Sequence, residues 1–174
     1  VLRREVKWAQ MSANWHTQMS KNFDKIKDRS RKGIPSNMRG ACWQLLSKSR
    51  VQMESADNAG VYRMLLTKPL ESEIAGVIER DLGRTFPTHS LFHDAEGVGQ
   101  RQLHNILHVY CNIDPEVGYV QGMGFIVGTL LTQMGEEEAF WCLHAMMNNE
   151  TYNLREMFRP GLPMLQMFFF QLER

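Results

Sequence analysis

The sequence predicts an all-α fold in a single globular domain. Apolar residues recur mostly at helical spacings, and no segment keeps the two-residue period of a strand for long. The chain has 174 residues, 43% of them hydrophobic and 22% charged, which suits one domain with a sizeable core. Residues 122–134 are the best candidate for a membrane span. They fall short of the roughly 20 residues that a span needs and contain polar interruptions, so we expect a buried helix and no transmembrane segment.

The first 32 residues are predicted to form a basic, amphipathic helical extension of the domain. Segment 3–28 carries one helical stripe with gaps of 3, 4, 4, 4 and 3 positions, formed by Trp8, Met11, Trp15, Met19, Phe23 and Ile26. Residues 1–40 contain ten Lys and Arg against three Asp and Glu, whereas the rest of the chain contains ten against sixteen. The net charge of +1 therefore argues against nucleic acid or an acidic membrane as a partner of the whole chain. A local anionic contact of the N-terminal segment stays open.

Three helices are expected in the next part of the chain. The segment Gly33-Ile-Pro35-Ser36 interrupts the backbone, and residues 37–46 then fit a short helix. Residues 61–66 fit a helical turn. Residues 72–82 repeat their apolar side chains at helical spacing, and Gly83 marks the expected end of that helix.

The remaining elements are also predicted to be helical. Gly97-Val-Gly99 precedes a long amphipathic helix, and residues 112–118 form the next loop. The helix after this loop is expected to carry Gln121 near its first turn. The acidic triplet 136–138 opens another helix, where negative charge complements the helix dipole. Residues 164–172 are strongly apolar.

The cysteines are expected to be free thiols. Three cysteines cannot all pair, and Cys42, Cys111 and Cys142 lie far apart with no CxxC element, which favours a reducing cytosol. Cys111 together with His108 could suggest a thiol nucleophile. A cysteine on an apolar helix face is far more often buried and inert, so we predict no thiol chemistry.

Two histidine pairs raise the alternative of a metal site. The pairs are His89 with His93 and His104 with His108, and each could bind a metal from one helical face. Neither pair belongs to a His-Glu-x-x-His motif, and Pro87 breaks the segment of the first pair. We therefore predict no metal site.

Two polar residues stand beside helical boundaries in a pattern suited to phosphoryl transfer. Arg84 follows the predicted helix end at Gly83, and Gln121 follows the loop at 112–118. A guanidinium can stabilise the charge that develops on phosphoryl oxygens, and a carboxamide can both donate to and accept from an attacking water. The alternatives are a helix-terminal arginine that binds carbonyl groups and an amide that binds nearby backbone. We expect both side chains at one solvent-open cleft.

Three motifs in this order resemble the TBC-domain family of Rab GTPase-activating proteins. The family motifs R-x-x-x-W, I-x-x-D-x-x-R and Y-x-Q correspond to Arg39-Gly-Ala-Cys-Trp43, Ile78 to Arg84, and Tyr119-Val-Gln121. The resemblance covers residues 33–174 and implies a multi-helix TBC domain. Since the family's domain extends further, we expect part of its C-terminal subdomain to be lacking. The chain also begins at Val1 without a secretion signal, and we expect it to be a fragment of a longer protein.

The resemblance implies a GTPase-activating protein that supplies Arg84 and Gln121 in trans as catalytic arginine and glutamine fingers. It implies supporting roles for four further residues: Asp81 aims the arginine, Tyr119 packs beneath the glutamine loop, Trp43 belongs to the core, and Arg39 braces the site. The alternative function is a non-catalytic TBC-fold binding module for a small GTPase or scaffold. Such a module has no chemical need of Arg84 or Gln121, so their presence favours catalysis.

The resemblance also indicates the partner and the cellular setting. The sequence contains no glycine-rich phosphate loop, so the chain needs no cofactor of its own, and the partner is expected to bind GTP and magnesium. That partner is a Rab-type small GTPase in its GTP-bound form, and nucleic acid is not expected to bind. We expect a cytoplasmic protein of vesicle trafficking, held at endomembranes through its partner.

Overall fold

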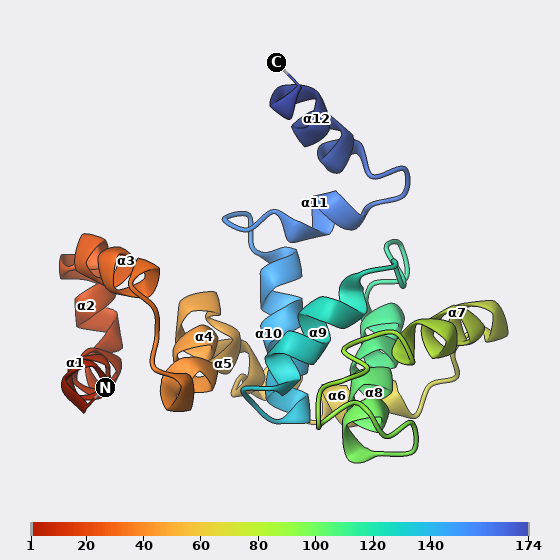
Figure 1. The fold of residues 1–174 in the computed structure, drawn as a ribbon, viewed down its shortest axis with the longest axis horizontal. Helices are drawn as coiled ribbons and strands as arrows, with labels where there is room; N and C mark the ends of the chain where they lie inside the picture. The colour runs from red at the N-terminus through yellow and green to blue at the C-terminus, as the bar shows by residue number, and fades with distance from the viewer. Residues whose placement is uncertain (1, 174) are drawn as a thin grey trace.

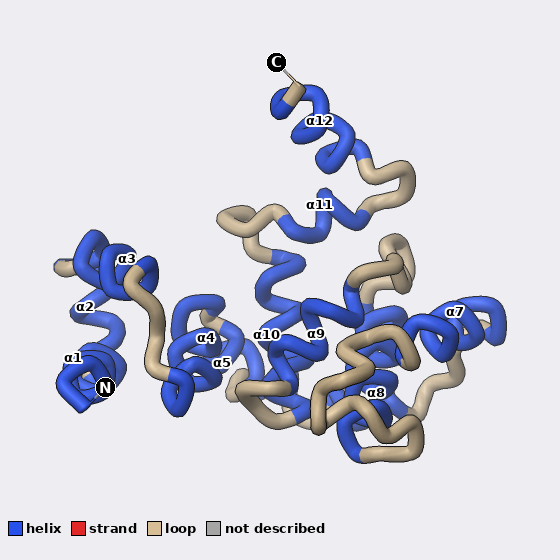
Figure 2. The backbone as a smooth tube through the Cα atoms, in the orientation of Figure 1, coloured by secondary structure: helices blue, strands red, loops and turns tan. Residues whose placement is uncertain are grey.

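Helices and their connecting loops make up the described part of the chain. The computed structural model describes residues 2–173, and no strand occurs among them (Figures 1 and 2). The all-α prediction is therefore confirmed.

The N-terminal segment forms three helices instead of the single helix that its apolar stripe suggested. They are α1 (Leu2–Ala13), α2 (Trp15–Lys21) and α3 (Phe23–Arg31). The breaks fall at Asn14 and Asn22, whose backbone ψ angles of 37° and 33° leave the helical range. Asparagine is a weak helix former because its side chain competes for nearby backbone groups. The prediction of one continuous helix was wrong at these two residues.

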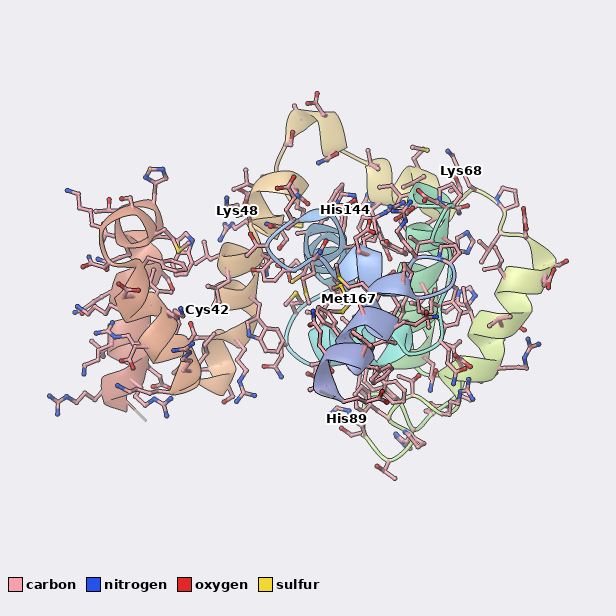
Figure 3. All side chains as sticks on the ribbon, turned by 90° about the horizontal axis from the view of Figure 1, so that it is seen from above. Cys42, Lys48, Lys68, His89, His144 and Met167 are labelled. Atoms are coloured by element: carbon pink, nitrogen blue, oxygen red, sulfur yellow. The ribbon has the colours of Figure 1, made fainter. Side chains whose placement is uncertain are left out.

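The breaks let the N-terminal helices enclose a small core of their own. Trp8 and Met11 from α1 and Ile26 from α3 are buried together with Cys42, whereas Phe23 stays exposed. Cys42 belongs to α4 (Arg39–Ser47) and lies toward the N-terminal helices in Figure 3. The extension therefore packs on the domain, and a domain boundary at residue 33 stays a prediction.

The main core forms around two long helices, α8 (Val98–Ile113) and α10 (Glu136–Asn148). Helix α8 packs against α6 (Val61–Leu66), α7 (Ser72–Leu82), α9 (Met123–Leu131) and α10. Helix α10 also packs against α4, α5 (Ser49–Met53) and α9. Short 3₁₀ turns at Ser36–Met38 and Ala56–Asn58 link the smaller elements. This arrangement brings the C-terminal end of α7 close to the N-terminal end of α9.

The start of α10 follows the sequence prediction. Its acidic first turn lies at the positive end of the helix dipole, and the Glu138 carboxylate accepts a hydrogen bond from the Gly135 amide at 2.9 Å. That bond satisfies one of the amides that a helix start leaves unpaired.

The chain ends in an arm beyond the C-terminal end of α10. It contains α11 (Leu154–Phe158) and α12 (Pro163–Leu172), which extend away from the rest of the molecule in Figure 1. Helix α12 packs chiefly on α11 and leaves apolar side chains exposed, among them Met167, Phe169 and Phe170. Within residues 2–173, no helix is long and apolar enough to cross a membrane.

Candidate functional site

The arginine of the second motif lies on a tight turn just after α7. Helix α7 ends at Leu82, and Gly83 follows it with an ordinary right-handed φ of −62°. The turn is closed because the Thr85 amide donates to the Leu82 carbonyl at 3.0 Å and the Thr85 hydroxyl donates to the Asp81 carbonyl at 2.9 Å. Arg84 is therefore held at its backbone, while its side chain is 57% exposed.

Asp81 connects the arginine turn with the glutamine segment. Its carboxylate is buried, and one oxygen pairs with Arg84 Nη2 while the other accepts the Tyr119 hydroxyl at 2.6 Å. Burial, together with this hydrogen bond to a carboxylate, raises the pKa of Tyr119 above its usual range. The phenol therefore remains a hydrogen-bond donor, and the arginine turn and the glutamine segment share one buried anion.

Gln121 lies on a short segment between two glycines with left-handed backbone. Gly118 has a φ of +58° and Gly122 a φ of +101°, a region that residues with a Cβ atom rarely adopt. Gly122 is the N-cap of α9, so Gln121 stands two residues before the helix begins at Met123. The Gln121 side chain is exposed and has no hydrogen-bond partner among residues 2–173.

Helix α9 fits against the arginine turn through two glycines. A Cβ atom at Gly124 would lie 2.9 Å from Thr85 Oγ1, and one at Gly128 would lie 2.9 Å from Cδ2 of Phe86. Phe86 itself has a left-handed φ of +49° and stacks edge-on with Phe125. This close approach fixes the two segments relative to each other. Sequence analysis missed it, although the Gly124-x-x-x-Gly128 spacing on one helical face was a visible signal.

Gln100 is a second supporting residue that the sequence analysis did not identify. It is buried on α8, and its amide nitrogen donates to the carbonyls of Leu82 at 3.3 Å and Phe92 at 2.7 Å. It thereby gives the Leu82 carbonyl at the end of α7 a second donor besides the Thr85 amide. No local pattern marks such a residue, because its partners come from other parts of the chain.

The arginine turn and the glutamine segment face each other across a cleft of about 520 Å³. Arg84 and Gln121 both line it, as do Asp81 and Tyr119. The remaining lining residues are Thr85, Val120, Gly122, Gly124, Phe125 and Leu162. The cleft thus presents a guanidinium and a carboxamide to the same volume of solvent.

Arg39 and Trp43 do not line this cleft. Arg39 is exposed at the start of α4 and donates from Nε to the Ile34 carbonyl at 3.2 Å. Trp43 is half-buried, packs on the main core and lines a separate apolar groove of about 570 Å³. That groove meets the cleft at Phe125, which lines both. The expected bracing of the site by Arg39 has no contact that supports it in the described residues.

The surroundings of the histidines and cysteines do not favour metal or thiol chemistry. His108 Nε2 hydrogen-bonds with the Lys68 carbonyl at 2.7 Å, and burial together with His108 lowers the pKa of His104. In the part of the chain that the structure describes, no three His, Cys, Asp or Glu residues cluster so as to hold a metal. All three cysteines are buried and unpaired, and burial raises the pKa of Cys111 to about 12. A thiol with so high a pKa is mostly protonated at neutral pH, and the protonated form is the less nucleophilic one.

Known proteins that match this chain over most of its length contain a TBC domain. A family model described as the Rab-GTPase-TBC domain matches residues 36–174, and the chain belongs to this family. It is 41% identical over 143 residues to Carabin of Mus musculus, and 42% identical over 166 residues to Rab GTPase-activating protein tbc-11 of Caenorhabditis elegans. These matches cover 82% and 95% of this chain, and the chain spans 32% and 17% of the two relatives.

Solved structures show the same fold. The crystal structure of the Chlamydomonas flagellar RabGAP TBC domain aligns with 96% of this chain at a TM-score of 0.66 and 28% identity. The Ypt/Rab-GAP domain of Gyp1p aligns with 82% of this chain at a TM-score of 0.59 and 20% identity, which supports the fold alone. The chain covers 62% and 55% of these two structures. The prediction of a TBC fold is confirmed.

Proposed function

We propose that this chain is a GTPase-activating domain that docks on a Rab-type small GTPase in its GTP-bound form and supplies Arg84 and Gln121 to the bound nucleotide. The observation that carries the proposal is the shared cleft, where side chains from two separate loops face one volume. Membership of the RabGAP-TBC family indicates the class of partner. A role in vesicle trafficking follows from that class.

The surroundings of Arg84 suit an arginine that reaches into a partner. One nitrogen, Nη2, is paired with Asp81, while the other donors of the guanidinium stay available for an incoming ligand. The pair restricts the direction of the side chain without burying it. When the partner covers the cleft and excludes water, the guanidinium attracts the negative charge that develops on the transferring phosphoryl group more strongly.

The surroundings of Gln121 suit a residue that orients water. A carboxamide offers both donors and an acceptor, so one group can hold a water molecule in line with the bond that breaks. Gln121 has both functions free, since no described residue binds its side chain. We propose that it replaces the partner's own glutamine in this task.

The nucleotide and its magnesium belong to the partner in this proposal. The chain has no glycine-rich loop followed by Lys-Ser or Lys-Thr that could hold phosphates. The residues of the cleft include one carboxylate, Asp81, and both of its oxygens already bind protein groups. The cleft therefore suits an anion brought by a partner better than a resident metal.

Single-turnover GTP hydrolysis by a panel of Rab-type GTPases at saturating domain tests the proposal. Arg84→Ala should lower stimulated hydrolysis by roughly 10³-fold or more, the scale of known arginine fingers. Gln121→Ala should also lower turnover while affinity for the GTP-bound partner persists. Arg80→Ala is the matched control, because Arg80 is exposed on α7, the helix that precedes Arg84, and does not line the cleft.

The same assay separates catalysis from binding. A non-catalytic module would bind the GTP-bound partner without accelerating hydrolysis, and neither substitution would then change the rate. If Gln121→Ala keeps full activity while mutation of the partner's glutamine abolishes stimulation, Arg84 is the sole finger.

A further inference from the structure

The segment that leads to Gln121 starts in a second polar network outside the cleft. Asp114 follows the last residue of α8, and its carbonyl accepts the Gly118 amide at 2.9 Å. Its carboxylate accepts the Tyr110 hydroxyl at 2.9 Å. Asp114 therefore closes the loop at 114–118 through its main chain, while its side chain binds back to α8.

Arg155 of α11 binds this carboxylate in a two-pronged geometry. Its Nε lies 2.7 Å from one oxygen of Asp114, and its Nη2 lies 2.9 Å from the other. Nη2 also lies 2.7 Å from a carboxylate oxygen of Glu116 in the same loop. The side chains of Arg155 and Asp114 are only 23% and 12% exposed, so solvent screens this pair less than a surface pair.

The lowered pKa of Asp114 is consistent with a carboxylate that is tightly bound by donors. Burial by itself would raise its pKa, but the hydrogen bonds from Arg155 and Tyr110 together outweigh burial and lower the pKa below its usual value. The anion is therefore retained at neutral pH, and the contact with Arg155 persists.

The loop that follows the helix of Arg155 provides part of the cleft wall. The chain leaves α11 after Phe158 and reaches Leu162, which has a left-handed φ of +50° and lines the cleft. Arg155 thus joins the C-terminal arm to the loop that precedes Gln121, 41 positions earlier at Asp114. The ion pair between Arg155 and Asp114 therefore links the two chain segments that lead to Leu162 and to Gln121 in the cleft.

We propose that Arg155 is a positioning residue for Gln121. Through Asp114 it orders residues 114–122, so that the carboxamide is held where the partner's nucleotide can meet it. The catalytic part of this proposal rests on the proposed function, whereas the ordering of the segment does not. Without Arg155 the loop samples more conformations, fewer of them present Gln121, and turnover falls although the docking surface is still present.

Arg159, at the other end of α11, offers a matched control. Arg159 lies 3.0 Å from Glu116 and 3.1 Å from Glu156, but it forms no ion pair with Asp114. Its side chain is 43% exposed. Arg159→Ala removes a similar charge near the arm without releasing Asp114. Arg155→Lys keeps the charge at 155 and removes the planar fork.

Two measurements on the full chain test the proposal. The first is hydrogen exchange of the backbone amides. The second is single-turnover GTP hydrolysis by a Rab-type GTPase that the wild-type chain stimulates, with the affinity of the chain for that GTPase measured separately. For Arg155→Ala we expect exchange at residues 117–122 to become at least about 10-fold faster. The rate at saturation should fall at least about 10-fold, with affinity changed by less than about 3-fold. Arg155→Lys should lie between the wild type and Arg155→Ala, and Arg159→Ala should stay within about 2-fold of the wild type in every measurement.

The proposal would be overturned if amides 117–122 exchanged in Arg155→Ala at the same rate as in the wild type. It would also be overturned if weaker binding to the GTPase explained the whole loss of hydrolysis rate. If Arg155→Ala does not fold, Asp114→Asn serves as the second variant, because it weakens the pair and keeps an oxygen for the Tyr110 hydroxyl. The exchange measurement needs no GTPase. A wild-type chain that stimulates no GTPase would therefore refute the proposed function, while exchange still decides whether Arg155 orders the segment.

Discussion

Tyr119→Phe tests whether the shared carboxylate of Asp81 couples the arginine turn to the glutamine segment. The substitution removes one oxygen atom and keeps the ring, which is half-buried against the main core. It deletes the 2.6 Å hydrogen bond from the Tyr119 hydroxyl to Asp81. Asp81 then keeps Arg84 as its side-chain partner, at the exposed edge of the cleft.

The size of the effect follows from the burial of the two groups. A hydrogen bond to a charged acceptor contributes about 1.5–3 kcal/mol, and Asp81 is only 5% exposed, so water replaces the lost donor poorly. The pair between Asp81 and Arg84 is already present in the wild type, so it does not offset the loss. We expect the free energy of unfolding to fall by about 1.5–3 kcal/mol and Tm by roughly 3–12 °C. If the transition state for GTP hydrolysis lost the same free energy, hydrolysis would slow by about 10- to 150-fold. A smaller loss from the transition state would give a smaller effect on the rate.

Denaturant unfolding and single-turnover hydrolysis at saturating domain measure the two effects. Tyr152→Phe is the control, because its hydroxyl donates to the neutral Leu46 carbonyl at 3.1 Å from an exposed side chain. It should cost less, about 0.5–1.5 kcal/mol, and leave turnover unchanged. A double-mutant cycle with Asp81→Asn isolates the coupling between the two residues. The reasoning is refuted if Tyr119→Phe changes stability by less than about 0.5 kcal/mol and leaves the rate unchanged, since such values are typical of surface substitutions.

Three further predictions concern the chemistry, the packing and the pH dependence. Arg84→Lys should restore little of the activity lost in Arg84→Ala, because an ammonium lacks the planar fork; near-wild-type hydrolysis would make Arg84 a structural residue. Gly128→Ala brings a Cβ atom to 2.9 Å from the Phe86 ring and should destabilise the chain by about 1–3 kcal/mol in denaturant unfolding, which an unchanged midpoint would contradict. Because folding lowers the pKa of Asp114, its contribution to stability is complete above the unfolded value of about 3.9 and is lost as pH falls through the folded value. The free energy of unfolding of Asp114→Asn should therefore depend less on pH below about pH 5 than that of the wild type, and parallel curves would show that the pair with Arg155 does not stabilise the fold.

The sequence predicted most of the helices because their apolar periodicity is local. The helix at 72–82 and the opening of α10 at its acidic triplet both appeared as expected. The N-terminal stripe was misleading in one respect, since its spacing runs unbroken across Asn14 and Asn22. Periodicity reports which face of a segment is apolar and is insensitive to a break that preserves that face.

The site could be predicted only in part, for a related reason. Arg84 and Gln121 stand in motifs of adjacent residues, so a resemblance could locate them. The pairs that hold their loops join distant positions, 38 apart for Tyr119 with Asp81 and 41 apart for Arg155 with Asp114. Such pairs depend on how the helices pack, and a single sequence does not encode them in a local pattern.

The two loops combine exposed functional ends with buried anchors, and this combination has a physical reason. In the proposed function, Arg84 and Gln121 must reach a partner's nucleotide, so they have to be accessible before docking and cannot be packed in the core. Electrostatic stabilisation of a transition state also requires donors that need little reorganisation when the reaction occurs. Two nearly buried carboxylates meet both needs, since Asp81 restrains the arginine turn and Tyr119, while Asp114 restrains the loop before Gln121. Because each anchor is itself bound by an arginine and a tyrosine hydroxyl, its negative charge is compensated in place and opposes an incoming phosphate less than a free carboxylate would.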